Sequence, residues 1–294
     1  PVEEPAFEGS VVETVVLRVR KQAPERGSRV ALPGGARPQR ALPLGPELRF
    51  CSHLAPGLQR QVDAMERRGI PLGELFEVRD GISTGFQPFP RRLLGRVEDY
   101  VFIAADGTRA PFDPVKHVRI IDGAEFHAFT QVRWEGRWFE YDKAHEHAPP
   151  HPGRPFNCQL RDRAIFDRAE KLLTRQTAKG LIATLDRERY FVRNSVHVTF
   201  AKVPHQPLRP GVPERRSPAG VRSTVENGRR SSDRLVRRIS LAALCACLNT
   251  AYYERYFLTV TGENGKVFPQ VHIADLKRLP LLPELLREGG PLAE

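Results

Sequence analysis

The stretch Ser195-Val196-His197-Val198-Thr199-Phe200 is rich in β-branched and aromatic residues, which favour a strand, and 188–192 just before it has the same character. Residues 235–258 instead place apolar and small side chains along one stripe, which predicts a long helix. Its stripe is Leu235, Ile239, Ala243, Cys247 and Ala251. Strands and helices do not alternate regularly along the chain. We therefore predict an α+β fold, built on a mixed β-sheet, with a long helix in the C-terminal half.

Weaker patterns extend this outline on the N-terminal side. Residues 54–68 carry apolar side chains at spacings of three and four, which predicts a helix. Residues 72–78 predict a strand that runs into a glycine-bounded turn at 81–85, and 169–176 predict a further strand. Residues 130–141 predict a hairpin around Glu135-Gly136, with Val132, Phe139 and Tyr141 on one face and Gln131, Arg133, Trp138 and Glu140 on the other.

The N-terminal part predicts a domain boundary. Residues 11–20 read as a buried strand, and residues 21–47 are rich in Pro, Gly and Arg, as linkers are. Because one strand cannot bury its own faces, we expect it to complete a sheet of a preceding domain. The predicted organisation is therefore a C-terminal strand of a truncated domain at 1–22, a linker at 23–50, and a main domain at 51–294.

Composition predicts a soluble, cytoplasmic, basic protein. The 294 residues carry a formal net charge of +11, and the longest strongly apolar run, 241–248, is too short to span a bilayer. Four cysteines at irregular spacing do not form a disulfide framework. Residues 203–238 hold nine Arg against three acidic residues. Residues 203–233 are poor in apolar side chains, so we expect a mobile basic insertion that adds salt-dependent, non-specific affinity for a polyphosphate.

No complete active site is present in the sequence. The cluster His145-Glu146-His147 is followed by Pro149 and Pro150, which exclude the helix that a His-Glu-x-x-His zinc site requires, so we predict no metal. Gly81-Ile-Ser-Thr-Gly85 is out of register for a nucleophile elbow, and no Gly-Lys-Ser/Thr follows it. Cys245 and Cys247 are two residues apart on the predicted helix, which favours small core residues over ligands.

Several short segments follow one another in a characteristic order. They are Leu72-Gly-Glu-Leu-Phe-Glu-Val78 with Gly81-Ile-Ser-Thr-Gly85, Asp122-Gly-Ala-Glu-Phe126, Trp138-Phe-Glu-Tyr-Asp142, Ile165-Phe166, Glu170-Lys-Leu-Leu-Thr-Arg-Gln-Thr177, Asp186, Tyr190, Leu244–Asn249, Gly265–Val271 and Leu276–Pro280. This order, over most of 51–283, resembles the TaqI-like C-terminal specificity domain of N6-adenine DNA methyltransferases and type IIG restriction–modification enzymes. Residues 7–21 resemble the last strand of their methyltransferase domain. The chain departs from the pattern in the long insertion at 203–233 and in Asn249-Thr250, where Asn-Ser is usual.

The resemblance implies a DNA target-recognition domain of a bacterial or archaeal restriction–modification or phage-defence enzyme. In such enzymes an upstream domain binds S-adenosylmethionine and methylates a flipped adenine, while the specificity domain contacts that domain and reads double-stranded DNA. The fragment itself has no cofactor or catalytic motif, so we expect no cofactor and no methyl transfer from it alone. The DNA-binding candidates are the polar residues of the glycine turn, the hairpin and the central motif: Ser83, Thr84, Gln87, Arg91, Arg92, Arg133, Arg137, Arg175, Gln176 and Lys179.

Strand alternation separates two of these candidates. Arg175 and Gln176 are adjacent, so they point to opposite faces of a strand, and we expect one to read a base and the other to support the structure. Two other functions stay open. One is a nucleic-acid-binding or scaffold module without sequence preference, and the other is an autonomous nuclease, which the absence of an Asp…Glu-x-Lys pattern disfavours.

Overall fold

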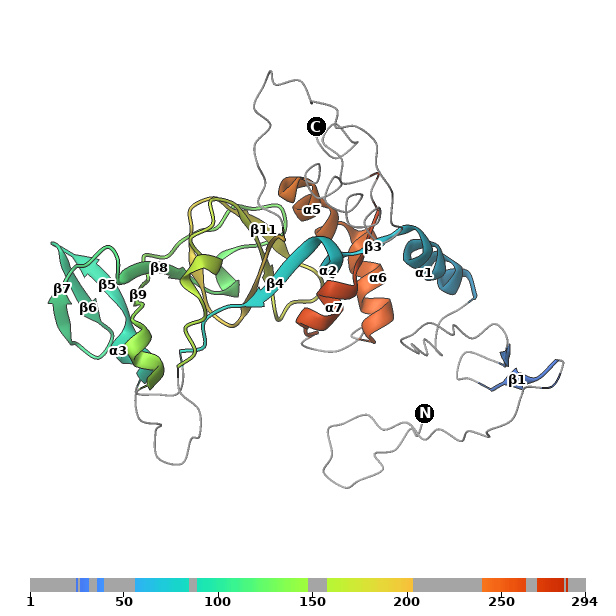
Figure 1. Ribbon diagram of the computed structural model, residues 1–294, viewed down its shortest axis with the longest axis horizontal. Helices are drawn as coiled ribbons and strands as arrows, with labels where there is room; N and C mark the ends of the chain where they lie inside the picture. The colour runs from blue at the N-terminus through green and yellow to red at the C-terminus, as the bar shows by residue number, and fades with distance from the viewer. Residues whose placement is uncertain are drawn as a thin grey trace, which may run out of the picture. The chain divides into compact units, whose positions relative to one another are not determined.

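The computed structural model (Figure 1) describes residues 25, 27–31, 36–39, 56–84, 89–147, 158–202, 240–262, 269–282 and 284. The chain divides into two compact units, Pro1–Ala64 and Met65–Glu294. In the first unit, β1 (Arg29–Val30) and β2 (Arg37–Pro38) pair antiparallel within the predicted linker. Helix α1 (Pro56–Arg68) confirms the helix expected over 54–68. The strand expected before residue 22 and the insertion at 203–233 lie outside the described residues.

The centre of the second unit is a four-stranded antiparallel sheet in the order β11-β10-β13-β4. Its strands are β4 (Phe76–Asp80), β10 (Lys171–Arg175), β11 (Ala183–Asp186) and β13 (Val196–Ala201). Leu173 lies opposite Val198, and both are fully buried. Strand β13 therefore confirms the strand that we predicted at 195–200. The strand predicted over 72–78 forms only in part, because residues 72–75 form a short helix, α2 (Leu72–Leu75).

A second, six-stranded sheet has the order β12-β8-β9-β5-β6-β7. Its strands are β5 (Leu94–Glu98), β6 (Val101–Ala104), β7 (Arg109–Pro111), β8 (His117–Ile121), β9 (Trp138–Glu140) and β12 (Phe191–Val192). Only β12 and β8 pair in parallel. Within this unit, the strands β5 to β9 lie on one side of the four-stranded sheet and the helices α5, α6 and α7 lie on the other (Figure 1). The mixture of sheets and helices confirms the α+β class.

The hairpin expected over 130–141 does not form. Strand β9 covers only Trp138–Glu140. It lies between β5 and β8 and pairs with both, so its two edges are already occupied. The turn itself is present, with Gly136 at φ 81°, a conformation that glycine adopts without strain. The expected facing also holds in part, because Phe139 and Tyr141 are buried and Val132 packs against the same core.

The main core fills the space between the two sheets. Leu173 and Val198 come from the four-stranded sheet, whereas Ile120 and Phe139 come from the six-stranded one. All four are at most 1% exposed, so truncating a side chain such as Phe139 to Ala costs about 3–5 kcal/mol. This shared core fixes the ends of strands from both sheets relative to one another. The loops that carry DNA-binding candidates extend from those ends.

The C-terminal helix is interrupted. Helix α5 (Leu241–Leu248) ends at Asn249, and α6 (Ala251–Thr261) begins after Thr250, whose hydroxyl caps Tyr253. The Asn249 side chain donates to and accepts from the backbone of Ala183, which ties the break to strand β11. The prediction of one continuous helix over 235–258 was therefore wrong at its centre. The capping groups there compete with helix propagation. Residues 235–239 lie outside the described residues.

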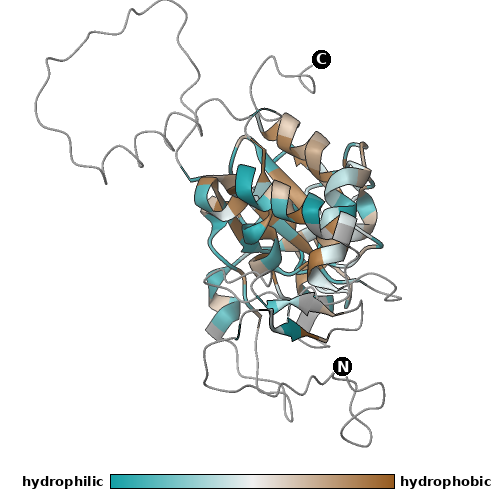
Figure 2. Ribbon diagram, turned by 90° about the vertical axis from the view of Figure 1, so that its right-hand side faces the viewer, coloured by the Kyte–Doolittle hydropathy of each residue, from teal (hydrophilic) through white to brown (hydrophobic). Residues whose placement is uncertain are grey.

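The remaining short elements close the fold. They are β3 (Ile70–Pro71), α3 (Phe89–Leu93), η2 (Gly123–Glu125), η3 (Lys143–His147), η4 (Arg163–Ile165), α7 (Ile273–Arg278) and β14 (Pro280–Leu281). Strand β14 pairs with β3, and α7 packs on α2 and β4. Hydrophobic residues, brown in Figure 2, run through both the helices and the strands between them. Across the described ranges no helix is long and apolar enough to cross a membrane.

Candidate nucleic-acid interface

Several strands of the two sheets end at one place. Strand β4 ends at Asp80 and β10 ends at Arg175, while the antiparallel β13 begins there at Val196. The glycine turn joins the loop after β12: Gly81 N donates to Val196 O over 3.1 Å, and Asn194 N donates to Ile82 O over 2.9 Å. A Cβ at Gly81 would lie 2.2 Å from Arg193 O, so this close approach requires glycine.

Ser195 lies at the centre of this meeting point, which we call the junction. It comprises the glycine turn from Gly81, the end of β10, the turn 193–195 and the loop 122–125. The Ser195 carbonyl oxygen accepts a 2.8 Å hydrogen bond from Gln176 N, and its Oγ accepts one of 3.2 Å from Gly123 N. The turn 193–195 thus connects the end of β10 with the loop after β8. The glycine turn, the central motif and residues 122–125 are far apart in sequence, and the structure brings them together here.

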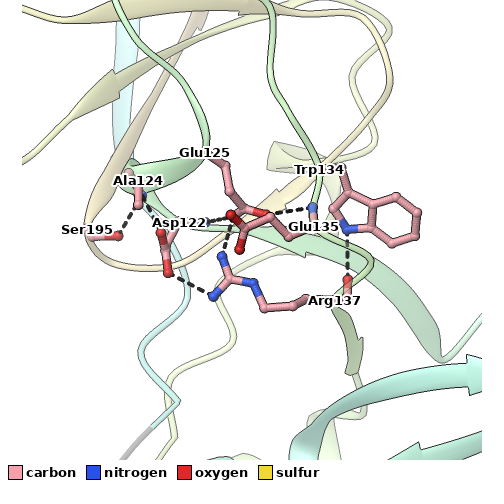
Figure 3. Close-up of polar contacts among 8 residues, drawn as sticks. Asp122, Ala124, Glu125, Trp134, Glu135, Arg137 and Ser195 are labelled. Carbon is pink, nitrogen blue, oxygen red and sulfur yellow. Dashed lines mark hydrogen bonds and ion pairs between the residues drawn. The ribbon is translucent and has the colours of Figure 1, made fainter.

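A network of one cation and two carboxylates underlies these loops (Figure 3). Arg137 Nη1 donates to Asp122 Oδ2 over 2.9 Å, and its Nη2 donates to Glu125 Oε2. Asp122 and Glu125 also form a reciprocal capping box around η2. Arg137, one of the DNA-binding candidates, is therefore engaged by two carboxylates within the fold.

The network sets the charge state of its members. Burial favours a higher pKa for Asp122, but the hydrogen bond from Arg137, the Ala124 N–H and the charges of Arg137 and Arg193 hold the pKa below its usual value. Burial favours a lower pKa for Arg137, and the two carboxylates raise it. Both groups are consequently charged at neutral pH, and the cation is committed to holding η2 in place.

Arg175 lies at the edge of the main core. Its guanidinium lies 5.7 Å from the Phe126 ring centroid, and its side chain passes the space where a Cβ of Gly123 would stand. Burial lowers its pKa, against the opposing charge of Asp122. Gln176 follows the end of β10, and its backbone is fixed on both sides, by Ser195 O and by Val271 N.

The other expected residues are placed differently. Ser83 exchanges backbone hydrogen bonds with Gln159 and is half-buried, whereas Thr84 is 3% exposed, so its hydroxyl does not lie on the surface where we expected it. Arg133 is exposed, and its backbone N–H donates to Glu125 O. Arg91 and Arg92 on α3, and Lys179 beyond Gln176, are exposed, and within the described residues no hydrogen bond joins them to the turn 193–195. Gln87 lies outside the described residues.

Sequence reasoning missed three residues of this junction. Arg193 and Asn194 belong to the same turn as Ser195, and Asn194 is exposed. Arg161 Nε donates to Gly81 O over 3.2 Å, and its Nη2 lies 3.8 Å from Asp80. The dipeptide Asn194-Ser195 between two strands is a turn signal that could have directed attention to this loop. Nothing in the local sequence links Arg161 to Gly81.

The described cysteine thiols are not activated nucleophiles. Burial raises the pKa of Cys158 to about 12 and those of Cys245 and Cys247 to about 11, so these thiols are protonated at neutral pH. Within the ranges that the structure describes, no group of three His, Cys, Asp or Glu side chains could hold a metal ion.

No model of a known protein family matches the chain, and no curated protein matches it.

Proposed function

We propose that the chain reads the sequence of double-stranded DNA, as the TaqI-like specificity part of an adenine-N6 DNA methyltransferase of the restriction–modification type. The observation that carries the proposal is the junction at Ser195, because it gathers three polar loops from the ends of strands in both sheets. A rigid scaffold that presents several loops together is the usual basis of sequence reading.

The chemistry of the junction suits duplex DNA. Amide side chains pair bidentately with adenine, arginine pairs with guanine, and other cations and hydroxyls hold phosphates. The turn 193–195 itself carries the amide of Asn194 and the cation of Arg193. Gln176 joins this turn through its backbone N–H, which donates to Ser195 O, and Arg133 joins the loop 122–125 through its backbone N–H, which donates to Glu125 O. We assign base reading to Gln176, Asn194 and Arg193, a phosphate contact to Arg133, and a positioning role to Arg137, which its two carboxylates already engage.

Methyl transfer is assigned to a domain upstream of this chain. In the proposed enzyme that domain would bind S-adenosylmethionine in the cytoplasm of a bacterium or archaeon and contact this one. The sequence contains no Asn-Pro-Pro-Tyr motif and no glycine-rich cofactor loop. Incubating the chain with labelled S-adenosylmethionine and mixed-sequence DNA should therefore give no incorporation, and robust transfer would contradict this division of labour.

Selection from a randomised duplex library tests the proposal. The chain should enrich one short motif, and Asn194→Ala should relax the preference at one or two base positions while leaving affinity for random DNA nearly unchanged. Lys116→Ala is a matched control, because this cation is exposed and paired with Asp142 away from the junction. Binding without any enriched motif would replace the proposal with a non-specific nucleic-acid-binding module.

A further inference from the structure

A second polar surface adjoins the junction on the side of strand β4. It is a groove of about 750 Å³ between β4, the segment 161–168, the end of β13 and helix α7. Five cations line it: Arg79, Arg161, Arg168, Lys202 and Lys277. Because Arg161 also donates to Gly81 O, the groove is continuous with the glycine turn of the junction.

The cations divide into two kinds. Arg79 lies 3.4 Å from Glu77, and Arg161 lies 3.8 Å from Asp80, so both have a carboxylate partner. Arg168, Lys202 and Lys277 form no ion pair within the described part of the chain. The third acidic lining residue, Asp162, accepts a hydrogen bond from Ala164 N at the start of η4. The groove therefore presents an excess of uncompensated positive charge.

Arg168 is held in place by an aromatic ring. Its guanidinium lies 3.7 Å from the centroid of the Phe200 ring, and among the described residues its buried Nε has no hydrogen-bond partner. Burial lowers the pKa of Arg168, yet a guanidinium stays protonated at neutral pH. A stacked and charged guanidinium that forms no ion pair among the described residues is suited to an anionic oxygen ligand, because arginine forks match phosphate geometry.

We infer that this groove binds the sugar–phosphate backbone of the duplex whose bases the junction reads. The inference rests on the proposed function for its ligand and adds the place where one strand of the duplex lies. Arg168, Lys202 and Lys277 then act as phosphate contacts, and the paired Arg79 and Arg161 shape the wall nearest the glycine turn. Such contacts fix register and supply affinity that does not depend on sequence.

Salt dependence of binding separates phosphate contacts from base contacts. We would measure the affinity of the chain for a random duplex and for its selected site between low and moderate salt. In the triple variant Arg168→Gln, Lys202→Gln and Lys277→Gln, both affinities should fall by the same factor. The slope of log affinity against log salt should become shallower by about 2–3, at roughly 0.9 for each lost phosphate.

A second triple variant controls for net charge. Arg67→Gln, Arg109→Gln and Arg255→Gln remove the same charge at exposed positions outside the groove and should change the slope by less than about one. Since Arg168 also packs on Phe200, the double variant Lys202→Gln and Lys277→Gln provides a version with intact packing and an expected slope change of about 2.

The outcomes distinguish the groove from the junction. An unchanged slope in the groove variants, or a wild-type chain that does not bind duplex DNA, would overturn the groove assignment. Loss of site preference at an unchanged slope would overturn it as well, because the groove would then read bases. If the unmodified chain shows no preferred site but the groove variants still flatten the slope, the groove assignment stands and the sequence-reading proposal fails.

Discussion

Lys171 Nζ lies 2.5 Å from Asp186 Oδ2, and both side chains are fully buried on neighbouring strands β10 and β11. Lys171 also donates to Phe166 O, while Asp186 accepts the backbone N–H groups of Glu188 and Tyr190. Burial lowers the pKa of Lys171, and Asp186 opposes that effect. The pair therefore anchors the start of the strand that ends at the junction.

Replacing Lys171 with Met should be strongly destabilising, because it leaves the Asp186 carboxylate buried without its cation. We expect the free energy of unfolding to fall by about 3–5 kcal/mol. Urea denaturation followed by circular dichroism measures this change. The adjacent Arg187–Glu170 pair is largely exposed, so Arg187→Met is a matched control with an expected cost of less than about 1 kcal/mol. Equal losses of unfolding free energy at the two positions would show that the buried pair contributes no more to stability than the exposed pair.

Variants of Arg137 and Arg133 distinguish a residue that positions a loop from a residue that contacts DNA. Arg137→Ala would leave the fully buried Glu125 side chain without its cation and should cost about 3 kcal/mol of stability. Arg133→Ala removes an exposed side chain and should change stability by less than about 0.5 kcal/mol. The DNA salt slope should drop by about one for Arg133→Ala, because we assign this residue to a phosphate, and stay unchanged for Arg137→Ala. The reverse pattern would make Arg137 the DNA contact.

Much of the fold could be predicted from local patterns. The strands at 171–175 and 196–201 and the helix at 56–68 have continuous signals in the sequence. The hairpin at 130–141 failed because alternation does not reveal which edges β9 will pair with. The long helix failed because Asn249 bonds to Ala183, a contact between residues far apart in sequence.

The candidate site was predictable only in its components. Arg175 and Gln176 stood out from the central motif, but the turn signal at Asn194-Ser195 does not reveal that Ser195 bonds to both Gln176 and Gly123. The engagement of Arg137 could not be foreseen, because the two carboxylates that bind it lie 12 and 15 residues away. Thr84 appeared exposed because burial depends on packing from both sheets. The sequence thus showed which residue types could bind DNA, but it did not show which other residues they contact in the fold.

The pH dependence of stability should report on Asp80. Asp80 Oδ1 lies 3.0 Å from His197 Nδ1. This contact with His197, together with the charge of Arg161, holds the pKa of Asp80 below its usual value against the opposing effect of burial. A carboxyl whose folded pKa is depressed stabilises the fold above its unfolded pKa and loses that contribution as pH falls through the folded value. Asp80→Asn should therefore reduce stability more at about pH 6 than at about pH 2. The partly exposed site limits the difference to about 1 kcal/mol. Urea midpoints at the two pH values measure it, and a pH-independent effect would contradict the role of the charge.

Arg175 and Gln176 provide the sharpest test of how the junction reads DNA. The Arg175 side chain packs over Phe126 and alongside Gly123, so we assign it the supporting role and assign base reading to Gln176, whose backbone is fixed by Ser195 and Val271. Gln176→Ala should cost about 1–3 kcal/mol on the selected site, relax one base position and leave affinity for random DNA nearly unchanged.

Arg175→Ala should instead lower the free energy of unfolding and weaken binding to every duplex by a similar factor, because it loosens the loop 122–125 rather than removing a base contact. Competition binding of both variants against a randomised site library, with urea denaturation alongside, measures the two effects. If Arg175→Ala relaxes one base position at unchanged stability, the two roles are exchanged. If both variants keep the wild-type preference, the end of β10 does not belong to the reading surface, and the turn 193–195 must supply the base contacts alone.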